Sequence, residues 1–173
     1  MRPDWNQHHM ASAFIASFRS HDTQSKVGAV LVNKQKKEIS RGYNGFCSEI
    51  DDSSLPTTRP FKYPLVVHAE ENAVSNLVIK PESAVLYATR MPCCKCSKLL
   101  WQNNVREWYV PKACIEPFEG VNSQDRIKHY TEDDELIFNL LLRSGLIVHY
   151  LDFTFDTLVE IVNSNSSYFS YLD

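Results

Sequence analysis

The chain has 173 residues, of which 43% are apolar and 23% charged, the balance of a single globular domain. A formal net charge of −3 argues against binding along a nucleic-acid backbone, which normally needs a basic face. No window approaches the about 20 apolar residues of a membrane helix, and the start, MRPDWNQHHM, lacks the features of a signal peptide. We therefore expect a cytoplasmic protein in a reducing compartment, with no membrane partner.

The first third of the chain predicts a helix followed by a β-hairpin. Apolar residues at helical spacing predict a helix from Trp5 to Phe18, with Asp4 as its N-cap. The apolar run from Lys26 to Val32 has the length of a central strand covered on both faces. After a polar turn, Glu38 to Tyr43 predicts a second strand, antiparallel to the first.

Helices and strands alternate through the rest of the chain, after a long irregular segment from Asn44 to Pro64. The pattern predicts helices at 65–77, 93–103 and 133–143, strands at 84–89, 106–110 and 146–151, and a polar connection at 112–132. Strands separated by helices favour an α/β fold in which a mixed sheet lies between helix layers.

We assign residues 1–151 to one domain and residues 152–173 to a C-terminal tail that is partly docked or flexible. The tail includes the low-complexity segment Asn163–Ser167, which we expect to be loose. Four apolar residues beyond it are able to dock on the body or on a partner subunit: Tyr168, Phe169, Tyr171 and Leu172.

The stretch MPCCKC, residues 91–96, holds three of the five cysteines. In a reducing compartment clustered cysteines more often bind metal or take part in catalysis than form disulfides. The spacing of Cys93 and Cys96 is C-x-x-C, which suits both metal binding and a redox pair, so the spacing alone leaves both open. Cys94 lies between them, and we interpret it as a small packing residue.

A third donor lies upstream at His68, in the stretch VHAEENA. A catalytic zinc typically takes three protein ligands and keeps a fourth position for water. His68, Cys93 and Cys96 supply that number, and each group lies at the start of a predicted helix, where the positive dipole end favours thiolate. Because zinc lowers the pKa of bound water toward ~7, the hydroxide needs a proton carrier nearby, and Glu70 stands two residues after the histidine.

Other interpretations of these residues remain open. His68 alone is typical of a buried core histidine, and Glu70 alone of an exposed helix carboxylate. A structural zinc would need a fourth protein ligand, for which Cys47, Cys114 and His129 are candidates. Together, however, H-x-E and P-C-x-x-C form the signature of zinc nucleobase deaminases.

From Trp5 to Leu151 the sequence resembles the cytidine/deoxycytidylate deaminase family, and within it the deoxycytidylate (dCMP) deaminases. The motifs that carry the resemblance are SKVGA at 25–29, GYNG at 42–45, KYP at 62–64, HAEENA at 68–73 and PCCKC at 92–96. The resemblance implies a three-layer α/β/α fold with a five-stranded mixed sheet. It also implies a Zn²⁺ cofactor and a small deoxynucleotide substrate, and we expect a homo-oligomer.

Carried over by position, the resemblance gives His68, Cys93 and Cys96 to zinc and makes Glu70 the proton shuttle. Three further residues are assigned to the substrate. Asn44 would contact the sugar or a nearby phosphate, although an asparagine here also suits a turn. Ala69 would let its backbone approach the pyrimidine, and Asn72 would either help form the pocket or brace the loop.

A nucleotide phosphate requires cations, and several flank the predicted site. We include Lys26 and Lys62 among the candidate substrate-binding residues. Arg19, Arg41, Arg59 and Arg90 are further candidates, and His21 is another anion contact, although each also suits a solvated surface position.

The function implied by the resemblance is hydrolytic deamination of a cytosine-containing deoxynucleotide, dCMP to dUMP plus ammonia. Three alternatives remain: deamination of dCTP, deamination of a nucleic-acid base, and a non-catalytic binding protein of the same fold. The chain departs from the family in two places. The segment after GYNG lacks the second glycine of members regulated by dCTP and dTTP, and the connection at 111–128, with Pro117–Gly120, is longer than usual.

Overall fold

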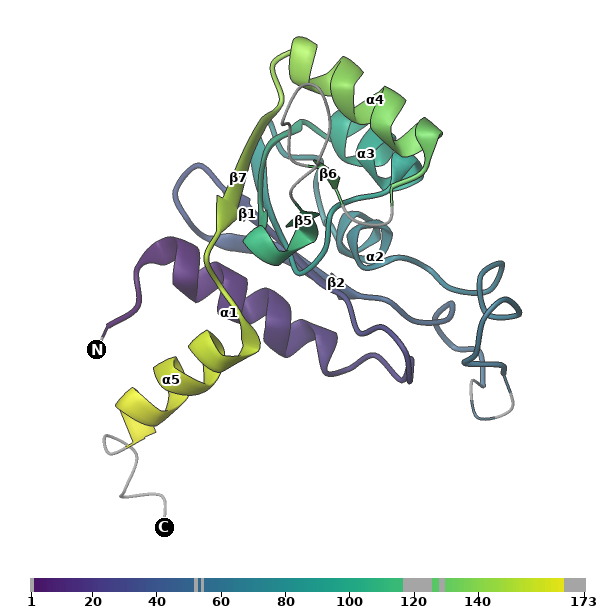
Figure 1. Cartoon of the computed structure of the whole chain (residues 1–173), viewed down its shortest axis with the longest axis horizontal. Helices are drawn as coiled ribbons and strands as arrows, with labels where there is room; N and C mark the ends of the chain where they lie inside the picture. Colours follow the sequence, from purple (N-terminus) through teal and green to yellow (C-terminus); the bar gives the residue numbers. More distant parts are fainter. Residues whose placement is uncertain (1, 52, 54, 117–125, 128–129, 167–173) are drawn as a thin grey trace.

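The computed structural model describes residues 2–51, 53, 55–116, 126–127 and 130–166 (Figure 1). The helices are α1 Trp5–Ser17, α2 Ala69–Ser75, α3 Cys94–Gln102, α4 Glu132–Arg143 and α5 Phe155–Ser166. The main strands are β1 Gly28–Asn33, β2 Glu38–Tyr43, β3 Ala84–Ala88, β4 Val105–Pro111 and β7 Ile147–Leu151. The strands β5 Ile115–Glu116 and β6 Arg126–Ile127 pair with each other, beside a 3₁₀ turn at Lys112–Cys114.

The five main strands form one mixed sheet in the order β2-β1-β3-β4-β7. β1 pairs antiparallel with β2 and β3, whereas β3–β4 and β4–β7 are parallel. Parallel neighbours require crossover connections, and α3 and α4 provide them. The predicted α/β fold with a five-stranded mixed sheet is confirmed.

Helices cover both faces of this sheet, so the domain has three layers (Figure 1). The pleat of β1 sends Ala29 and Leu31 into a core shared with α2, α3 and α4. Val30 and Val32 point the other way, into a core shared with α1 and α5. α1 begins at the predicted N-cap, where Asp4 Oδ1 accepts a hydrogen bond from the Gln7 amide at 2.8 Å.

Two predicted elements differ in the structure. The helix expected from Leu65 begins at Ala69, because Val67 instead exchanges two backbone hydrogen bonds with Gly45, at 2.8 and 3.1 Å. His68 is therefore the N-cap of α2 rather than a residue inside the helix.

The expectation that residues 163–167 are loose also needs correction, since Asn163 to Ser166 belong to α5. α5 docks because Phe153 packs beside Phe14, with ring centroids 5.4 Å apart, and because Leu158 is buried in the same core. The apolar positions 168, 169, 171 and 172, expected to dock, lie outside the described residues.

Among the described helices, none has both the length and the apolar character needed to cross a membrane.

Candidate metal centre and its cavity

Three donor atoms from two helix starts converge in the structure. His68 precedes α2, Cys93 is the N-cap of α3, and Cys96 lies one turn into α3. His68 Nδ1 lies 3.5 Å from each of the two sulfur atoms, and all three donor atoms fall within 4.8 Å of one another. The residues predicted to bind zinc are thus brought together.

The spacing of these donors suits a tetrahedral zinc ion. Bond lengths of about 2.1 Å to nitrogen and 2.3 Å to sulfur place such donors about 3.6 Å apart at the tetrahedral angle. The observed 3.5 Å separations match this value. One imidazole and two thiolates leave a fourth position for a water or a substrate atom, as in catalytic zinc sites.

The alternative of a structural zinc with four protein ligands finds little support among the residues that the structure describes. The group able to hold a metal contains His68, Cys93 and Cys96, without Cys47 or Cys114. The third candidate, His129, lies outside the described residues. Cys94, interpreted from the sequence as a packing residue, is half-buried and its sulfur is not part of the group.

Hydrogen bonds within the cluster shift the pKa values of its three side chains. The contacts from Cys96 and His68 lower the pKa of Cys93 to about 4, although burial alone would raise it. The contact with Cys93 raises the pKa of His68, and the same contact together with burial raises the pKa of Cys96. Cys93 is therefore a thiolate at neutral pH, the form that binds metal.

Glu71 joins the two helices that carry the donors. Its Oε2 accepts a hydrogen bond from the His68 amide at 3.2 Å, and its Oε1 pairs with Lys95 Nζ at 2.7 Å. Because Lys95 lies between Cys93 and Cys96, this carboxylate connects the start of α2 with the start of α3. Side chains that orient metal ligands in this way commonly influence metal affinity.

Glu70 lies beside the donors and is almost fully buried, with 4% of its surface exposed. Burial raises the pKa of Glu70 to about 7, while the proximity of His68 partly opposes the rise. A carboxyl group that titrates near neutral pH can accept and return a proton. Ala69, predicted to approach the pyrimidine, is also fully buried and lines the same cavity.

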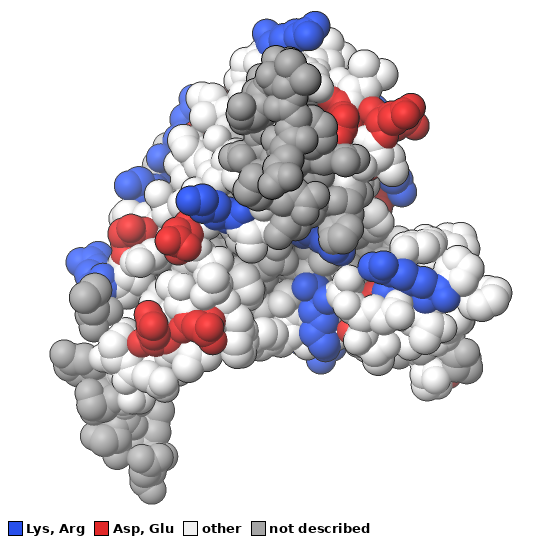
Figure 2. All heavy atoms as spheres, in the orientation of Figure 1, with Lys and Arg blue, Asp and Glu red and all other residues white. Residues whose placement is uncertain are grey.

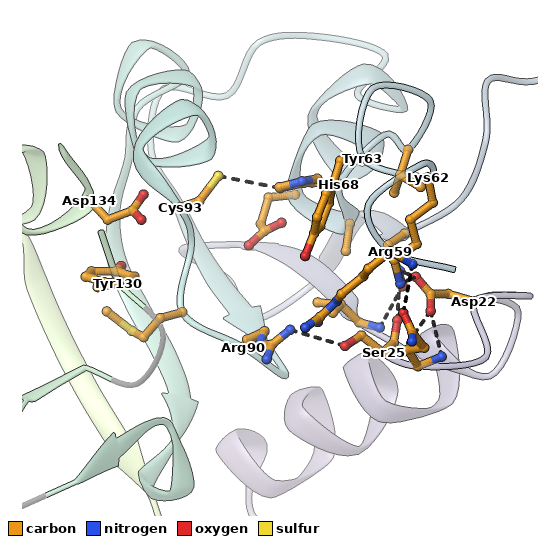
Figure 3. A pocket seen from close by; sticks show the side chains of 17 residues that line it. Asp22, Ser25, Arg59, Lys62, Tyr63, His68, Arg90, Cys93, Tyr130 and Asp134 are labelled. Carbon is orange, nitrogen blue, oxygen red and sulfur yellow. Dashed lines mark hydrogen bonds and ion pairs between the residues drawn. The ribbon is translucent and has the colours of Figure 1, made fainter. Parts of the chain in front are cut away.

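A cavity of about 550 Å³ adjoins these residues (Figure 3). Its volume falls in the range of about 300–1,000 Å³ typical of small-molecule sites. The lining residues are Asp22, Gln24, Ser25, Val27, Asn44, Arg59, Lys62, Tyr63, Val66, His68, Ala69, Glu70, Arg90, Met91, Cys93, Tyr130 and Asp134.

Tyr130 and Asp134, which the sequence analysis did not single out, form one wall of this cavity at the start of α4. Tyr130 donates its hydroxyl to the Pro92 carbonyl at 2.5 Å, and Asp134 Oδ1 accepts the Cys94 amide at 2.5 Å. Asp134 also closes a capping box with Thr131. The T-x-x-D pattern at 131–134 is a sequence signal for Asp134, but it indicates a helix start rather than a site, and it does not include Tyr130.

The polar residues predicted to bind substrate have different surroundings. Asn44 lines the cavity, but its amide group binds protein: Oδ1 accepts the Val27 amide at 2.7 Å, and Nδ2 donates to the Ser25 carbonyl at 2.9 Å. Asn72 donates a hydrogen bond to the carbonyl of Tyr43, the last residue of β2, at 3.0 Å, and it is not among the cavity-lining residues.

The candidate phosphate-binding cations divide into two groups. Lys26, Arg19 and Arg41 do not line the cavity: they lie on the Ser20 carbonyl, over the Tyr43 ring, and on Glu38, respectively. His21 packs against the Phe46 ring, 4.8 Å between centroids, and is also absent from the lining. Lys62, Arg59 and Arg90 do line the cavity.

Arg59 and Arg90 carry charge into the cavity. Arg90 Nη1 lies 3.4 Å from Ser25 Oγ, and the Arg59 side chain extends toward Arg90 and Ser25 in the view of Figure 3. Among the residues that the structure describes, neither guanidinium pairs with a carboxylate. Figure 2 shows Lys and Arg atoms on both sides of the recess beside the projecting loop, but no continuous basic stripe on the visible face.

The fold together with this donor set defines the class of the zinc-dependent deaminases, in which H-x-E and P-C-x-x-C supply the ligands and the acid–base residue. The family model for the cytidine and deoxycytidylate deaminase zinc-binding region matches residues 3–112. The chain belongs to this family.

Comparison with individual proteins supports the same family. Human deoxycytidylate deaminase is 37% identical over 111 residues, which cover 60% of this chain and 62% of that protein. ComE operon protein 2 of Bacillus subtilis is 31% identical over 162 residues, covering 84% of this chain and 80% of that protein. The match thus spans less than two thirds of the length of the curated deoxycytidylate deaminases of human and mouse.

The fold is similar to that of a solved phage enzyme. The dCMP deaminase of cyanophage S-TIM5, in its apo form, superimposes with a TM-score of 0.62 at 25% identity, covering 87% of this chain and all of that one. A second structure of the phage enzyme, in complex with dCMP and dUMP, gives a TM-score of 0.59 and covers 99% of that chain.

Proposed function

We propose that this protein is an enzyme that hydrolyses the exocyclic amine of a cytosine-containing deoxynucleotide, converting dCMP and water to dUMP and ammonia. The observation that carries the proposal is that one cavity holds two different sets of groups. Zinc donors and Glu70 lie at one end, and the cationic side chains of Arg59 and Arg90 lie near Ser25. This arrangement suits a ligand with a reactive ring at one end and an anionic group at the other.

When bound to His68, Cys93 and Cys96, zinc supplies a nucleophile at neutral pH by lowering the pKa of water to about 7. Glu70 accepts the proton that the water loses as its oxygen bonds to ring carbon C4. Glu70 delivers this proton to ring nitrogen N3. It then takes the remaining proton from the new C4 hydroxyl and delivers it to the amine, so that C4 becomes a carbonyl carbon, the C4–N bond breaks and ammonia leaves. A carboxyl group whose pKa is raised to about 7 is suited to both directions of transfer.

The phosphate is assigned to Arg59 and Arg90. Guanidinium groups bind phosphate oxygens in a bidentate manner, and the Ser25 hydroxyl beside Arg90 offers a further donor. Two like charges in one cavity are most stable when an anion neutralises them. This charge favours a nucleotide over a nucleoside, and relatives named deoxycytidylate deaminase favour the monophosphate.

A substrate panel tests this proposal. Zinc-loaded protein is incubated with deoxycytidine, dCMP, dCTP and a cytosine-containing oligonucleotide, and ammonia release is followed. We expect the highest kcat/KM with dCMP. A preference for dCTP or for the oligonucleotide would overturn the substrate assignment, and no ammonia from any of the four would overturn the assignment as an enzyme acting on cytosine.

A further inference from the structure

The irregular loop between β2 and α2 provides one wall of the cavity, including Arg59 and Tyr63. The loop projects from the body of the domain (Figure 1). The described residues between 46 and 66 form no helix or strand, so the position of Arg59 depends on local contacts rather than on regular structure. These contacts concentrate at one buried lysine.

Lys62 Nζ lies 2.5 Å from Asp22 Oδ2, and the two residues are only 4% and 6% exposed. Asp22 belongs to the connection between α1 and β1, far from Lys62 in the sequence. Its other oxygen, Oδ1, accepts the amides of Gln24 at 2.8 Å and Ser25 at 2.9 Å. Because both carboxylate oxygens are occupied, Asp22 is a fixed anchor for the lysine (Figure 3).

Backbone hydrogen bonds connect Lys62 to the turn that contains Arg59. The Lys62 amide donates to the Thr58 carbonyl at 3.2 Å, and the Lys62 carbonyl accepts the Leu65 and Val66 amides at 3.0 and 3.1 Å. The turn that contains Arg59 and Tyr63 is thus built around Lys62. A second contact holds Arg59 to the same connection between α1 and β1, since Gln24 Oε1 accepts a hydrogen bond from the Arg59 amide at 3.3 Å.

We propose that the buried Lys62–Asp22 pair is a positioning device that holds Arg59 at the phosphate end of the cavity. The inference rests on the proposed function for the nature of the ligand. Lys62 itself does not bind the phosphate in this account, because the Asp22 carboxylate already neutralises its ammonium group. The pair therefore controls the affinity for the anionic end of the substrate, whereas the chemistry at Glu70 is independent of it.

The test uses three full-length, zinc-loaded variants: Lys62→Met, Asp22→Asn and the double variant. Lys62→Met keeps the length of the side chain and removes its charge, and the double variant avoids an unpaired buried carboxylate if the single variant folds poorly. The matched control is Lys98→Met, since Lys98 is an exposed lysine on α3 away from the cavity.

For Lys62→Met we expect KM for dCMP to rise about 10- to 100-fold, since misplacing a positioning group by about 1 Å can cost about 10²-fold. kcat for dCMP and kcat/KM for deoxycytidine should stay within about 3-fold of wild type, because deoxycytidine has no phosphate to hold. In the Asp22→Asn background, Lys62→Met should change KM less than about 2-fold, since the pair acts as a unit. An equally large loss in that background would mean that Lys62 touches the phosphate directly, and would overturn the proposal.

A second readout does not depend on activity. Chymotrypsin can cleave after the exposed residue Phe61 once the loop opens locally, whereas the bond between Tyr63 and Pro64 is resistant to it. Asp22→Asn, which breaks the pair and leaves the loop sequence unchanged, should be cut there several-fold faster than wild type and Lys98→Met at the wild-type rate, and equal rates for all three proteins would overturn the proposal. If wild-type protein does not deaminate dCMP, the proposed function fails, while the cleavage rates still decide whether the pair holds the loop.

Discussion

Gly42 brings strand β2 into direct contact with the backbone of α2, the helix that carries Ala69 and Glu70. A Cβ atom added at Gly42 would lie 2.3 Å from the Ala69 carbonyl oxygen and 2.3 Å from the Ala73 amide nitrogen. Favourable contacts between such atoms begin at about 3.5 Å. Because both obstacles are backbone atoms, a Gly42→Ala change can be accommodated only if the helix retreats by about 1 Å.

This displacement sets the size of the expected effect. Overpacking a well-packed interior typically costs about 1–3 kcal/mol of the free energy of unfolding. For a chain of this length, that lowers Tm by roughly 2–4 °C for each kcal/mol. The start of α2 also carries His68 and Glu70, and a misplacement of about 1 Å at reacting groups can cost about 10²-fold in rate. We therefore expect Gly42→Ala to lose stability, and to lose about 10²-fold in kcat.

Thermal unfolding and dCMP deamination, measured on the same zinc-loaded preparation, check this prediction. The matched control is Gly45→Ala, because the nearest atoms to a Cβ there belong to side-chain rings, Tyr43 at 3.4 Å and His21 at 3.9 Å, which are ordinary contact distances. Gly45→Ala should keep wild-type stability and at least half of the activity. A Gly42→Ala protein as stable and active as Gly45→Ala would show that the close approach of β2 to α2 does not position the site.

Three further changes test separate parts of the structure. Glu70→Gln keeps the shape of the side chain but cannot carry a proton, so kcat should fall about 10²–10⁴-fold with zinc content unchanged; full activity would exclude Glu70 as the shuttle. Asp134→Ala removes the acceptor of the Cys94 amide and should weaken zinc affinity about 10–100-fold in chelator competition, whereas unchanged affinity would limit Asp134 to capping α4. His9 is 2% exposed, and its ring nitrogens lack hydrogen-bond partners among the described residues. Because a buried polar group without a partner destabilises the fold, His9→Phe should raise the free energy of unfolding, measured in urea at pH 8, by about 1 kcal/mol. A lower free energy of unfolding in this variant would refute the prediction. Burial lowers the pKa of His9, so the folded state binds fewer protons than the unfolded state, and the gain from His9→Phe should grow as the pH falls below about 6.5.

The metal donors could be predicted from the sequence because short-range signals specify them. The C-x-x-C spacing places Cys93 and Cys96 one turn apart, and Pro92 marks the start of their helix. The same holds for the sheet, in which the continuous apolar run of β1 indicated a strand buried on both faces. The predicted start of α2 was wrong because Val67 pairs with Gly45, which is distant in the sequence, and this pairing outweighs the helical periodicity.

The far wall of the cavity could not be predicted in this way. Tyr130 and Asp134 reach the site after a long connection, and nothing in its composition indicates that it returns to Pro92 and Cys94. Lys62 was identified as a cation near the site, but its partner Asp22 is 40 positions away. Whether a lysine binds substrate or a buried carboxylate depends on such pairings, which only the folded chain reveals.

We expect His68, Cys93 and Cys96 to hold one zinc ion, and the stretch MPCCKC contains a matched control for this expectation. Cys94 lies between the two ligands, but its sulfur is outside the donor cluster. Elemental analysis after zinc loading and dialysis should find one zinc per chain in wild type and in Cys94→Ser, and much less than one in Cys93→Ser and Cys96→Ser. Wild-type protein without stoichiometric zinc, or a Cys94→Ser protein that loses as much as Cys93→Ser, would contradict the account.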